Sequence, residues 1–321
     1  MTRVAVTGAG GAAGIAVIRE LRGQGHAVLA LDGDAWATGL RLADASLTIP
    51  RADSESFGAA IGSVLTSWSA QALISTVAEE LKPLATLSLD LANSGVATWL
   101  PSVHASEMCN DKWLFAEALR AQGVPHPLTS LDAESAAAGP WVVKPRRGRG
   151  SRDVSYVSDP EVLTSVVKAM DGNAIVQTQL LGREFTADTL TDRSGHTLCV
   201  VPRWRVETKA GISTKGETFA NTDVVDAVEA ALKAVGHEGP GCVQGFVTDE
   251  GQVSIMEINP RFSGGLPLSL AAGADLVGQY LRMILGDEPQ ASKLTYRSGV
   301  RMYRYYDAVF EYPETLDGNA E

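Results

Sequence analysis

The residues best suited to chemistry lie near the C-terminal end of the sequence, where an apolar run ends in Glu257, Asn259 and Arg261. Residues 253–259 predict a β-strand. Successive side chains of a strand point to opposite faces, so Glu257 and Asn259 are predicted to share one face with Ile255. Two oxygen donors would therefore emerge together at the end of this strand.

The preceding strand could add a third oxygen donor. Residues 242–248 form another apolar run, and the turn-forming residues after it predict a hairpin. If Glu250 and Gly251 form a two-residue loop, Gln244 lies opposite Glu257, and opposed residues of an antiparallel pair point the same way. A three-residue loop would shift the register by one residue and turn every side chain to the other face.

Three converging oxygens from Gln244, Glu257 and Asn259 would suit a hard cation such as Mg²⁺, with Mn²⁺ as an alternative, that also holds phosphate oxygens. A polar strand end exposed to solvent is the other interpretation. Arg261 and the Gly264-Gly265 pair favour the metal site, because a cation and exposed backbone N–H groups beside a metal can bind phosphate.

Composition excludes several classes of protein. The chain has 321 residues, enough for two domains or for one domain with lobes. Its formal net charge of −11 argues against a nucleic-acid partner, which would need a basic surface. No apolar run approaches the roughly 20 residues of a membrane-spanning helix, so no membrane partner is expected. Three scattered cysteines and no signal-peptide core predict a cytoplasmic protein.

The front of the chain has the alternating pattern of a parallel α/β sheet. Residues 4–7 predict a strand, Gly8–Gly14 a glycine turn that opens a helix, and residues 27–31 a second strand ending at Asp32. This unit could bind NAD(P), with Asp32 on the ribose, as in the short-chain dehydrogenases and sugar epimerases. Against this, no Tyr is followed four residues later by Lys, the proton-transfer pair of those enzymes. The preferred hypothesis is that the glycines let the helix pack closely on the strand.

Two acids follow the strand predicted at residues 72–76. Glu79 and Glu80 would stand at the carboxyl end of the parallel sheet, where such sheets bind ligands, so both are candidate substrate-binding residues. Acids are also favoured in the first turn of a helix, because they interact well with its dipole.

The middle of the chain is rich in cations. Asn110 is predicted to cap a helix with Lys112 in its first turn, where a bound anion or simple exposure would explain a cation. Lys144 lies on a predicted strand, and the loop after it, residues 146–152, combines arginines with glycines. Such a loop could hold phosphate; a nucleic-acid-binding loop is the alternative, disfavoured by the acidic net charge.

From residue 174 onward the pattern indicates antiparallel strands, with Arg203 and Arg205 in one basic segment and a helix at residues 223–235. Residues 295–310, rich in Tyr and Arg, are predicted to complete the sheet or to support a homodimer. We therefore expect two architectures in one chain, an α/β front and an α+β remainder.

In their order and spacing these features resemble the ATP-grasp ligases, and in particular one synthetase half of the carbamoyl phosphate synthase large subunit. The motifs that carry the resemblance are Lys112, the Val143-Lys144-Pro145 strand, the loop at 146–152, the pair Gln177 and Glu184, and the motif from Glu257 to Arg261. The resemblance implies an ATP-grasp fold in three parts. These are a Rossmann-like domain at 1–107, a small lobe over the nucleotide at 108–175, and a large lobe with the metal and phosphate site at 176–321.

The resemblance also implies how the nucleotide would bind. The adenine would contact backbone groups of Thr178 and Leu180, and Glu184 would bind the ribose. Lys112 and Lys144 would meet the phosphates. The loop that would close over the phosphates contains Gly148, Gly150 and Ser151.

At the other end of the nucleotide, the resemblance implies a metal and a reaction centre. The Mg²⁺ ligands would be Gln244, Glu257 and Asn259. Arg261 matches the arginine near the transferred phosphoryl group, and Arg203 and Arg205 fall in the segment that faces it. Together with Lys144, these arginines are the candidate catalytic residues, since Mg²⁺ and cations neutralise charge on the transferred group.

The implied reaction activates a small carboxylate as an acyl phosphate, which an amine then attacks. Both substrates would meet between Glu79, Glu80 and the segment containing Arg261, Gly264 and Gly265. Three alternatives remain open: phosphorylation of bicarbonate or another carboxylate without amide formation, an NAD(P)-dependent oxidoreductase, and nucleotide binding without catalysis.

Overall fold

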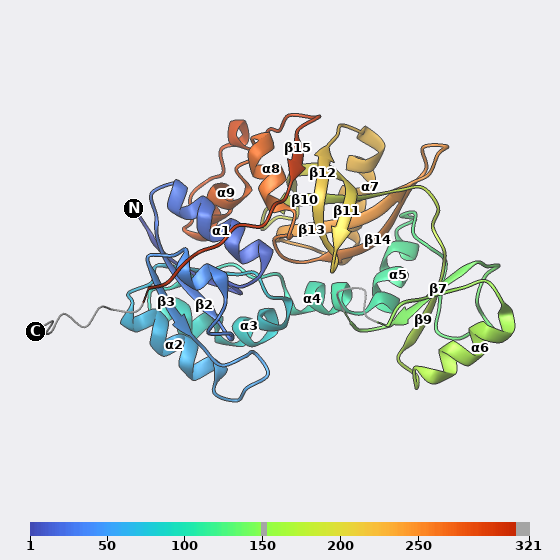
Figure 1. The fold of residues 1–321 in the computed structure, drawn as a ribbon, viewed down its shortest axis with the longest axis horizontal. Helices are drawn as coiled ribbons and strands as arrows, with labels where there is room; N and C mark the ends of the chain where they lie inside the picture. Colours follow the sequence, from blue (N-terminus) through green and yellow to red (C-terminus); the bar gives the residue numbers. More distant parts are fainter. Residues whose placement is uncertain (149–152, 313–321) are drawn as a thin grey trace, which may run out of the picture.

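The computed structural model of the protein describes residues 1–148 and 153–312. Its strands form three sheets of five, four and six strands. In Figure 1 the five-stranded sheet at the N-terminus and the six-stranded sheet lie beside each other, and the small four-stranded sheet stands at the far right. The mixed α/β and α+β architecture confirms the predicted fold class.

The N-terminal sheet is parallel, because helices connect its strands. Across the sheet its order is β3 (Ala45–Thr48), β2 (Ala27–Asp32), β1 (Arg3–Thr7), β4 (Ala72–Ser75) and β5 (Ala97–Thr98). One face packs on α1 (Ala12–Gly23) and the short 3₁₀ helix η1 (Thr38–Arg41), and the other on α2 (Phe57–Ser67) and α3 (Ala78–Asn93). Strands buried on both faces explain the continuous apolar runs of this part of the sequence.

The turn between β1 and α1 requires glycine. Gly8 has φ +71°, and a Cβ added at Gly14 would lie 2.1 Å from the carbonyl oxygen of Gly8. Asp32 Oδ2 accepts a hydrogen bond from Gly10 N at 2.7 Å, so this acid holds the turn in place. This geometry supports the hypothesis that the glycines allow close packing of helix on strand.

The small sheet is antiparallel, with the order β6 (Thr129–Ser130), β9 (Ala174–Thr178), β7 (Trp141–Pro145) and β8 (Ser155–Val157). It packs on α6 (Pro160–Ala169). Two helices, α4 (Val103–Asn110) and α5 (Lys112–Ala121), connect it to the front sheet.

The predicted cap of α5 is wrong by one residue. Asn110 is the last residue of α4, and Asp111 is the cap, because its side chain accepts hydrogen bonds from the backbone N–H groups of Trp113 and Leu114. Asp111 also binds Arg146, with Nε 2.7 Å from Oδ1. A carboxylate suits this position better than an amide, because its negative charge interacts favourably with both the helix dipole and the Arg146 guanidinium.

The large sheet is antiparallel and carries most of the candidate site. Its order is β14 (Val253–Asn259), β13 (Gly239–Val247), β10 (Arg183–Thr191), β11 (Thr197–Lys209), β12 (Ile212–Thr218) and β15 (Arg301–Tyr303). Its other elements are α7 (Thr222–Val235), α8 (Leu266–Ala272), α9 (Leu276–Ile284) and the 3₁₀ helix η2 (Ala291–Lys293). Of the two alternatives for residues 295–310, completing the sheet holds for residues 301–303, which form β15 and pair with β12, and the dimer stays a prediction.

A shared apolar core joins the front sheet to the large sheet. It contains Val4 and Val6 of β1, Leu190 of β10, Val201 of β11 and Leu281 of α9. Helix α1 lies between the front sheet and α9 (Figure 1), so burial of its apolar side chains stabilises both bodies together.

The division of the chain at 107/108 and 175/176 stays a proposal; the second boundary falls inside β9. No helix in residues 1–148 and 153–312 combines the length and apolar character that crossing a membrane requires.

Candidate active site

The hairpin of β13 and β14 brings Gln244 opposite Glu257, as predicted, but by a different route. The loop has three residues, 249–251, because Thr248 N donates to Gln252 O at 2.9 Å. By itself this loop would put Gln244 opposite Met256. A bulge restores the pairing: Gly245 pairs with Ile255, and Gln244 pairs with Glu257, so Met256 is the extra residue.

The bulge also corrects the predicted faces of β14. Ile255 and Ile258, which strict alternation would separate, both pack in the same buried cluster as Val253. Glu257 and Asn259 therefore lie on the opposite face from Ile255, where strict alternation had placed them together. The two oxygen donors still share a face, and that face is turned away from the apolar core.

Cross-strand register extends this polar face over four neighbouring strands. Glu257 on β14 pairs with Gln244 on β13, Gln244 with Thr186 on β10, and Thr186 with Arg203 on β11. Paired residues point the same way, so these four side chains form one row. On β13, Cys242 and Phe246 lie on the same face as Gln244. Cys242 pairs with Asn259 and with Asp188, and Phe246 pairs with Glu184, so these three polar side chains lie on the same face as the row.

The predicted metal ligands converge on Glu257. Its Oε1 accepts a hydrogen bond from Asn259 Nδ2 at 3.0 Å. With its amide oriented to suit its neighbours, Gln244 also donates to Glu257 Oε1 at 3.2 Å and accepts from Arg205 Nη1 at 3.2 Å. Within the described residues no three His, Cys, Asp or Glu side chains form a metal-binding group, so a cation here would rely on one carboxylate and amide oxygens. The two amide oxygens accept hydrogen bonds from Arg205 and Arg261, so the donor set fits Mg²⁺ once both amides turn their oxygens toward the cation and phosphate oxygens fill its other positions.

Two lysines share the electrostatic environment of Glu257. Lys144 is buried, and its pKa is lowered to about 8, mainly by burial; the charge of Glu257 opposes this shift, and the charge of Lys112 adds to it. Burial likewise lowers the pKa of Lys112, against the charges of Glu257 and Asp111. Asp111 is already paired with Arg146 and Arg147, so Glu257 is the carboxylate that both lysines share, and the cluster has room for anionic charge.

Lys112 also meets the loop predicted to cover the phosphates. Its Nζ donates to Gly148 O at 2.9 Å, and its backbone N donates to Arg146 O at 3.1 Å. The cationic first turn of α5 is thus held against the start of this loop. Two predicted loop residues, Gly150 and Ser151, lie outside the described residues.

On the side predicted to hold the nucleoside, Arg205 Nε lies 3.1 Å from Glu184 Oε1. Burial raises the pKa of Glu184, Arg205 lowers it, and Glu257 raises it. Thr178 N donates to Leu128 O at 3.0 Å, so of its two backbone groups Thr178 could offer its carbonyl oxygen to an adenine. Leu180 lies in the connection from β9 to β10, after Gln179.

The guanidinium of Arg203 is buried and binds other side chains of the protein. Its guanidinium binds Asp188 through Nε and Nη2, each at 2.9 Å, and donates to Ser263 Oγ at 3.0 Å. A Cβ added at Gly265 would lie 2.0 Å from Arg203 Nη1, so glycine is required there. Arg203 is 1% exposed, and this geometry makes it a support for the turn after Arg261.

Arg261 lies beside the metal ligands. Its Nη2 is 3.4 Å from Asn259 Oδ1, and its Nη1 donates to Phe262 O at 3.0 Å. Both partners are neutral oxygens, so the positive charge of Arg261 is available to an anion at this end of β14.

The two candidate acids of the front sheet occupy different positions. Glu80 is buried, and its Oε2 accepts hydrogen bonds from Thr7 Oγ1 and, at 2.7 Å, from Ser75 Oγ. Burial raises the pKa of Glu80, against these hydrogen bonds. Glu79 lies beside it in the first turn of α3. The sheet's carboxyl end approaches the large lobe at Gly264, where an added Cβ would lie 3.6 Å from Ala12 Cβ.

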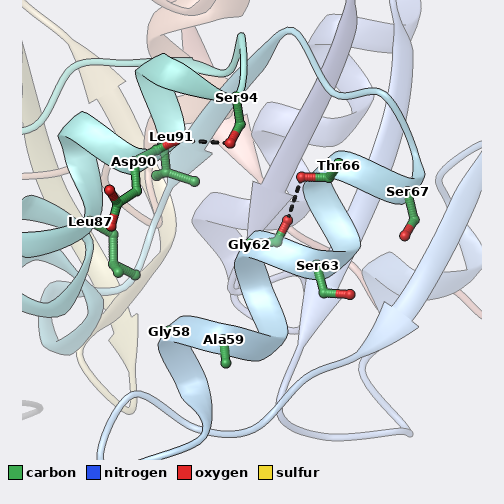
Figure 2. Close-up of a pocket in the computed structure, with 10 residues that line it drawn as sticks. All are labelled: Gly58, Ala59, Gly62, Ser63, Thr66, Ser67, Leu87, Asp90, Leu91 and Ser94. Atoms are coloured by element: carbon green, nitrogen blue, oxygen red, sulfur yellow. Dashed lines mark hydrogen bonds between the residues drawn. The ribbon is translucent and has the colours of Figure 1, made fainter.

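A separate groove lies between α2 and α3 (Figure 2). Its lining includes Gly58, Gly62 and Thr66 of α2 and Leu87 and Asp90 of α3. None of the ten lining residues is a cation or belongs to the candidate site, so this groove has no group suited to a phosphate.

Sequence patterns missed two residues of this region, Asp188 and Arg304, and gave the helix cap to Asn110 in place of Asp111. Asp188 lies within the buried part of β10, where an acid requires a partner, and that requirement could have pointed to Arg203. Nothing in the sequence places Arg304 beside Gly264.

Comparison with known proteins shows which fold this chain shares. Residues 171–306 match a family described as ATP-grasp in the biosynthetic pathway with Ter operon. The chain has the ATP-grasp fold of known ligases, which confirms the resemblance predicted from the sequence.

Particular relatives are distant. The uncharacterized protein y4rH of Sinorhizobium fredii is 25% identical over 243 residues, which are 68% of this chain and 51% of the relative. The chain thus spans about half the length of this curated relative.

Two solved structures share the fold. The biotin carboxylase domain of Hydrogenobacter thermophilus 2-oxoglutarate carboxylase, in complex with MgADP, ADP and bicarbonate, has a TM-score of 0.71 and 18% identity, covering 92% of this chain and 72% of that chain. The L-amino acid ligase of Bacillus licheniformis has a TM-score of 0.71 and 17% identity, covering 93% of this chain and 78% of that chain.

Proposed function

We propose that the protein is an ATP- and Mg²⁺-dependent ligase that activates a small carboxylate as an acyl phosphate for attack by an amine. The observation that carries the proposal is the position of Glu257. It collects the amides of Gln244 and Asn259 on one face of the large sheet, and it shares its environment with Lys112 and Lys144. This is a donor set for a metal next to a donor set for phosphates.

Each group would have a defined task. Glu257, Gln244 and Asn259 would hold the Mg²⁺, which when bound neutralises charge on the phosphates. Lys112 and Lys144 would bind phosphate oxygens, and Arg261 would meet the transferred phosphoryl group. The protein then needs no general base, since positioning and charge neutralisation suffice for phosphoryl transfer.

The nucleoside would lie along the edge between the two lobes. Glu184 would bind the ribose, and the backbone of Thr178 and Leu180 the adenine. For Glu184 to do so, its ion pair with Arg205 must adjust, and Arg205 would keep the hydrogen bond that its Nη1 donates to Gln244.

The relatives support two versions of the reaction. The amino acid ligase favours an amine as the nucleophile, and the carboxylase domain, bound to bicarbonate, favours bicarbonate as the acid. We propose amide formation as the main function and bicarbonate or carboxylate phosphorylation as the second candidate. A homodimer stays a prediction that size-exclusion chromatography with light scattering can test.

Thermal unfolding with nucleotides tests the proposal first. ATP with Mg²⁺ is expected to raise the melting temperature, while NAD(P)H leaves it unchanged; the reverse result would exclude the ligase and favour the oxidoreductase. ADP release is then measured with amino acids and small carboxylates, with and without amines. Stimulation that requires both an acid and an amine supports amide formation, and stimulation by bicarbonate alone supports the second candidate.

A further inference from the structure

Arg304 is fixed between two parts of the large lobe. It follows β15, its backbone N donates to Thr214 O at 2.9 Å, and its Nε donates to Ser213 O at 3.0 Å. Its Nη2 donates to the carbonyl oxygen of Gly264. The guanidinium is therefore held in one place beside the turn that follows Arg261.

The charge of Arg304 is not balanced within the described part of the chain. Neighbouring arginines each have a carboxylate: Arg203 has Asp188, and Arg205 has Glu184. Arg304 binds only backbone carbonyls in residues 1–148 and 153–312. Burial lowers the pKa of Arg304, and the charge of Arg203 lowers it further, so the surroundings are short of negative charge.

The turn at residues 262–264 has an arginine at each end. Arg261 donates to Phe262 O at 3.0 Å and reaches Asn259 on the metal side, while Arg304 binds Gly264 O. The Gly264 end touches the front domain, because an added Cβ there would lie 3.6 Å from Ala12 Cβ. A molecule that extends from the phosphoryl group toward the front domain would pass Arg261 first and Arg304 second.

The segment after Arg304 passes along one side of this region. It runs from β15 across to the front domain (Figure 1), where Glu311 Oε2 lies 2.6 Å from Arg41 Nε. Along the way Lys209 Nζ lies 5.7 Å from the ring centroid of Tyr306. Arg304 thus stands where the large lobe, the front domain and this segment meet.

We propose that Arg304 is a specificity-determining residue that binds a second anionic group on the carboxylate substrate, so that the preferred substrates are dicarboxylic acids, including acidic amino acids. The inference rests on the proposed ligase function. The reacting carboxylate lies at Arg261. The second anionic group accepts hydrogen bonds from the remaining guanidinium N–H groups of Arg304. A monocarboxylic acid of the same length leaves those donors without a partner.

The test compares matched acids: propionate with malonate, butyrate with succinate, and valerate with glutarate, by ADP release in the presence of ATP, Mg²⁺ and an amine. In the wild type, kcat/KM is expected to be about 10- to 100-fold higher for the dicarboxylates, the range of one charge-assisted hydrogen-bonded contact. Arg304→Gln should remove this preference and leave the KM for ATP unchanged. Arg304→Lys should restore part of it.

Arg301→Gln is the matched control, because Arg301 lies on β15 just before Arg304, is exposed and pairs with Glu217. It should retain the preference. Equal losses for both members of a pair in Arg304→Gln, or no preference in the wild type, would overturn the inference while leaving the ligase intact. Failure of every acid to stimulate ADP release, or failure of ATP to bind, would overturn the proposed function and the inference with it.

Discussion

Lys144 offers a test in which stability and function change in opposite directions. Its side chain is buried at 8% exposure, and burial lowers its pKa from 10.5 to about 8. One pKa unit corresponds to about 1.4 kcal/mol, so holding this buried ammonium charged at pH 7 costs roughly 3 kcal/mol of folding free energy. Replacement by Met, which has a similar shape and no charge, removes that cost.

We therefore expect Lys144→Met to raise the free energy of unfolding at pH 7 by up to about 3 kcal/mol, a figure that already includes the attraction to Glu257 because the pKa of about 8 reflects both effects. The sign with pH follows from proton binding. Between about pH 8 and 10.5 the unfolded wild type keeps a proton that the folded protein has lost, so wild-type stability rises across this window. In the variant, the contribution of residue 144 to that rise disappears.

The assay is urea unfolding at pH 7 and pH 9.5, with and without ATP and Mg²⁺. The variant should be more stable than the wild type without nucleotide at pH 7 and should lose the stabilisation by nucleotide. Lys168→Met, at an exposed position on α6, is the control and should change neither quantity. A variant that is less stable at pH 7, or one that ATP still stabilises fully, would refute the electrostatic argument.

Two further substitutions and one deletion test the geometry of the site. Glu257→Gln should keep the fold, as measured by circular dichroism, but lower ADP release at least about 100-fold, because Mg²⁺ loses its one carboxylate; full activity would rule out this metal site. Gly265→Ala should lower the free energy of unfolding in urea by about 2–4 kcal/mol, since its Cβ would collide with Arg203. Gly264→Ala, whose Cβ would be 3.2 Å from the nearest side-chain atom, should lower it by less than half as much. Equal losses would contradict the packing argument. Deletion of Met256 should remove the bulge but keep Glu257 opposite Gln244 on the polar face, because Glu257 would then follow Ile255 directly in regular alternation. Stability and ADP release should therefore largely survive, and an unfolded or inactive deletion variant would contradict this register.

Local features of the fold could be predicted because short-range physics controls them. The apolar runs of residues 4–7 and 27–31 became buried parallel strands, and Asp159 caps α6 ahead of Pro160. The ATP-grasp fold could likewise be predicted, since the order of motifs along the chain is a property of the sequence alone. The residue types at Lys112, Lys144 and Glu257 are enough to indicate phosphate and metal binding without knowledge of their arrangement.

Helix ends and strand faces are harder to predict from the sequence, because small tertiary effects decide them. Asp111 caps α5, and not its neighbour Asn110, since Arg146, which follows β7, stabilises a carboxylate there. The pairing of Gln244 with Glu257 was predicted correctly from an incorrect loop length, and the bulge at Met256 compensated for the extra loop residue.

By itself, then, the sequence determined which chemical groups this protein has and in what order its strands and helices follow. Tertiary structure alone decided which of those groups face one another. Arg203 is committed to Asp188, fifteen positions away, while Arg304 reaches Gly264, forty positions away, and carries a charge with no carboxylate among the described residues. The reason is that ion pairing depends on register between strands and on contacts between distant segments, which the burial of the whole apolar core selects.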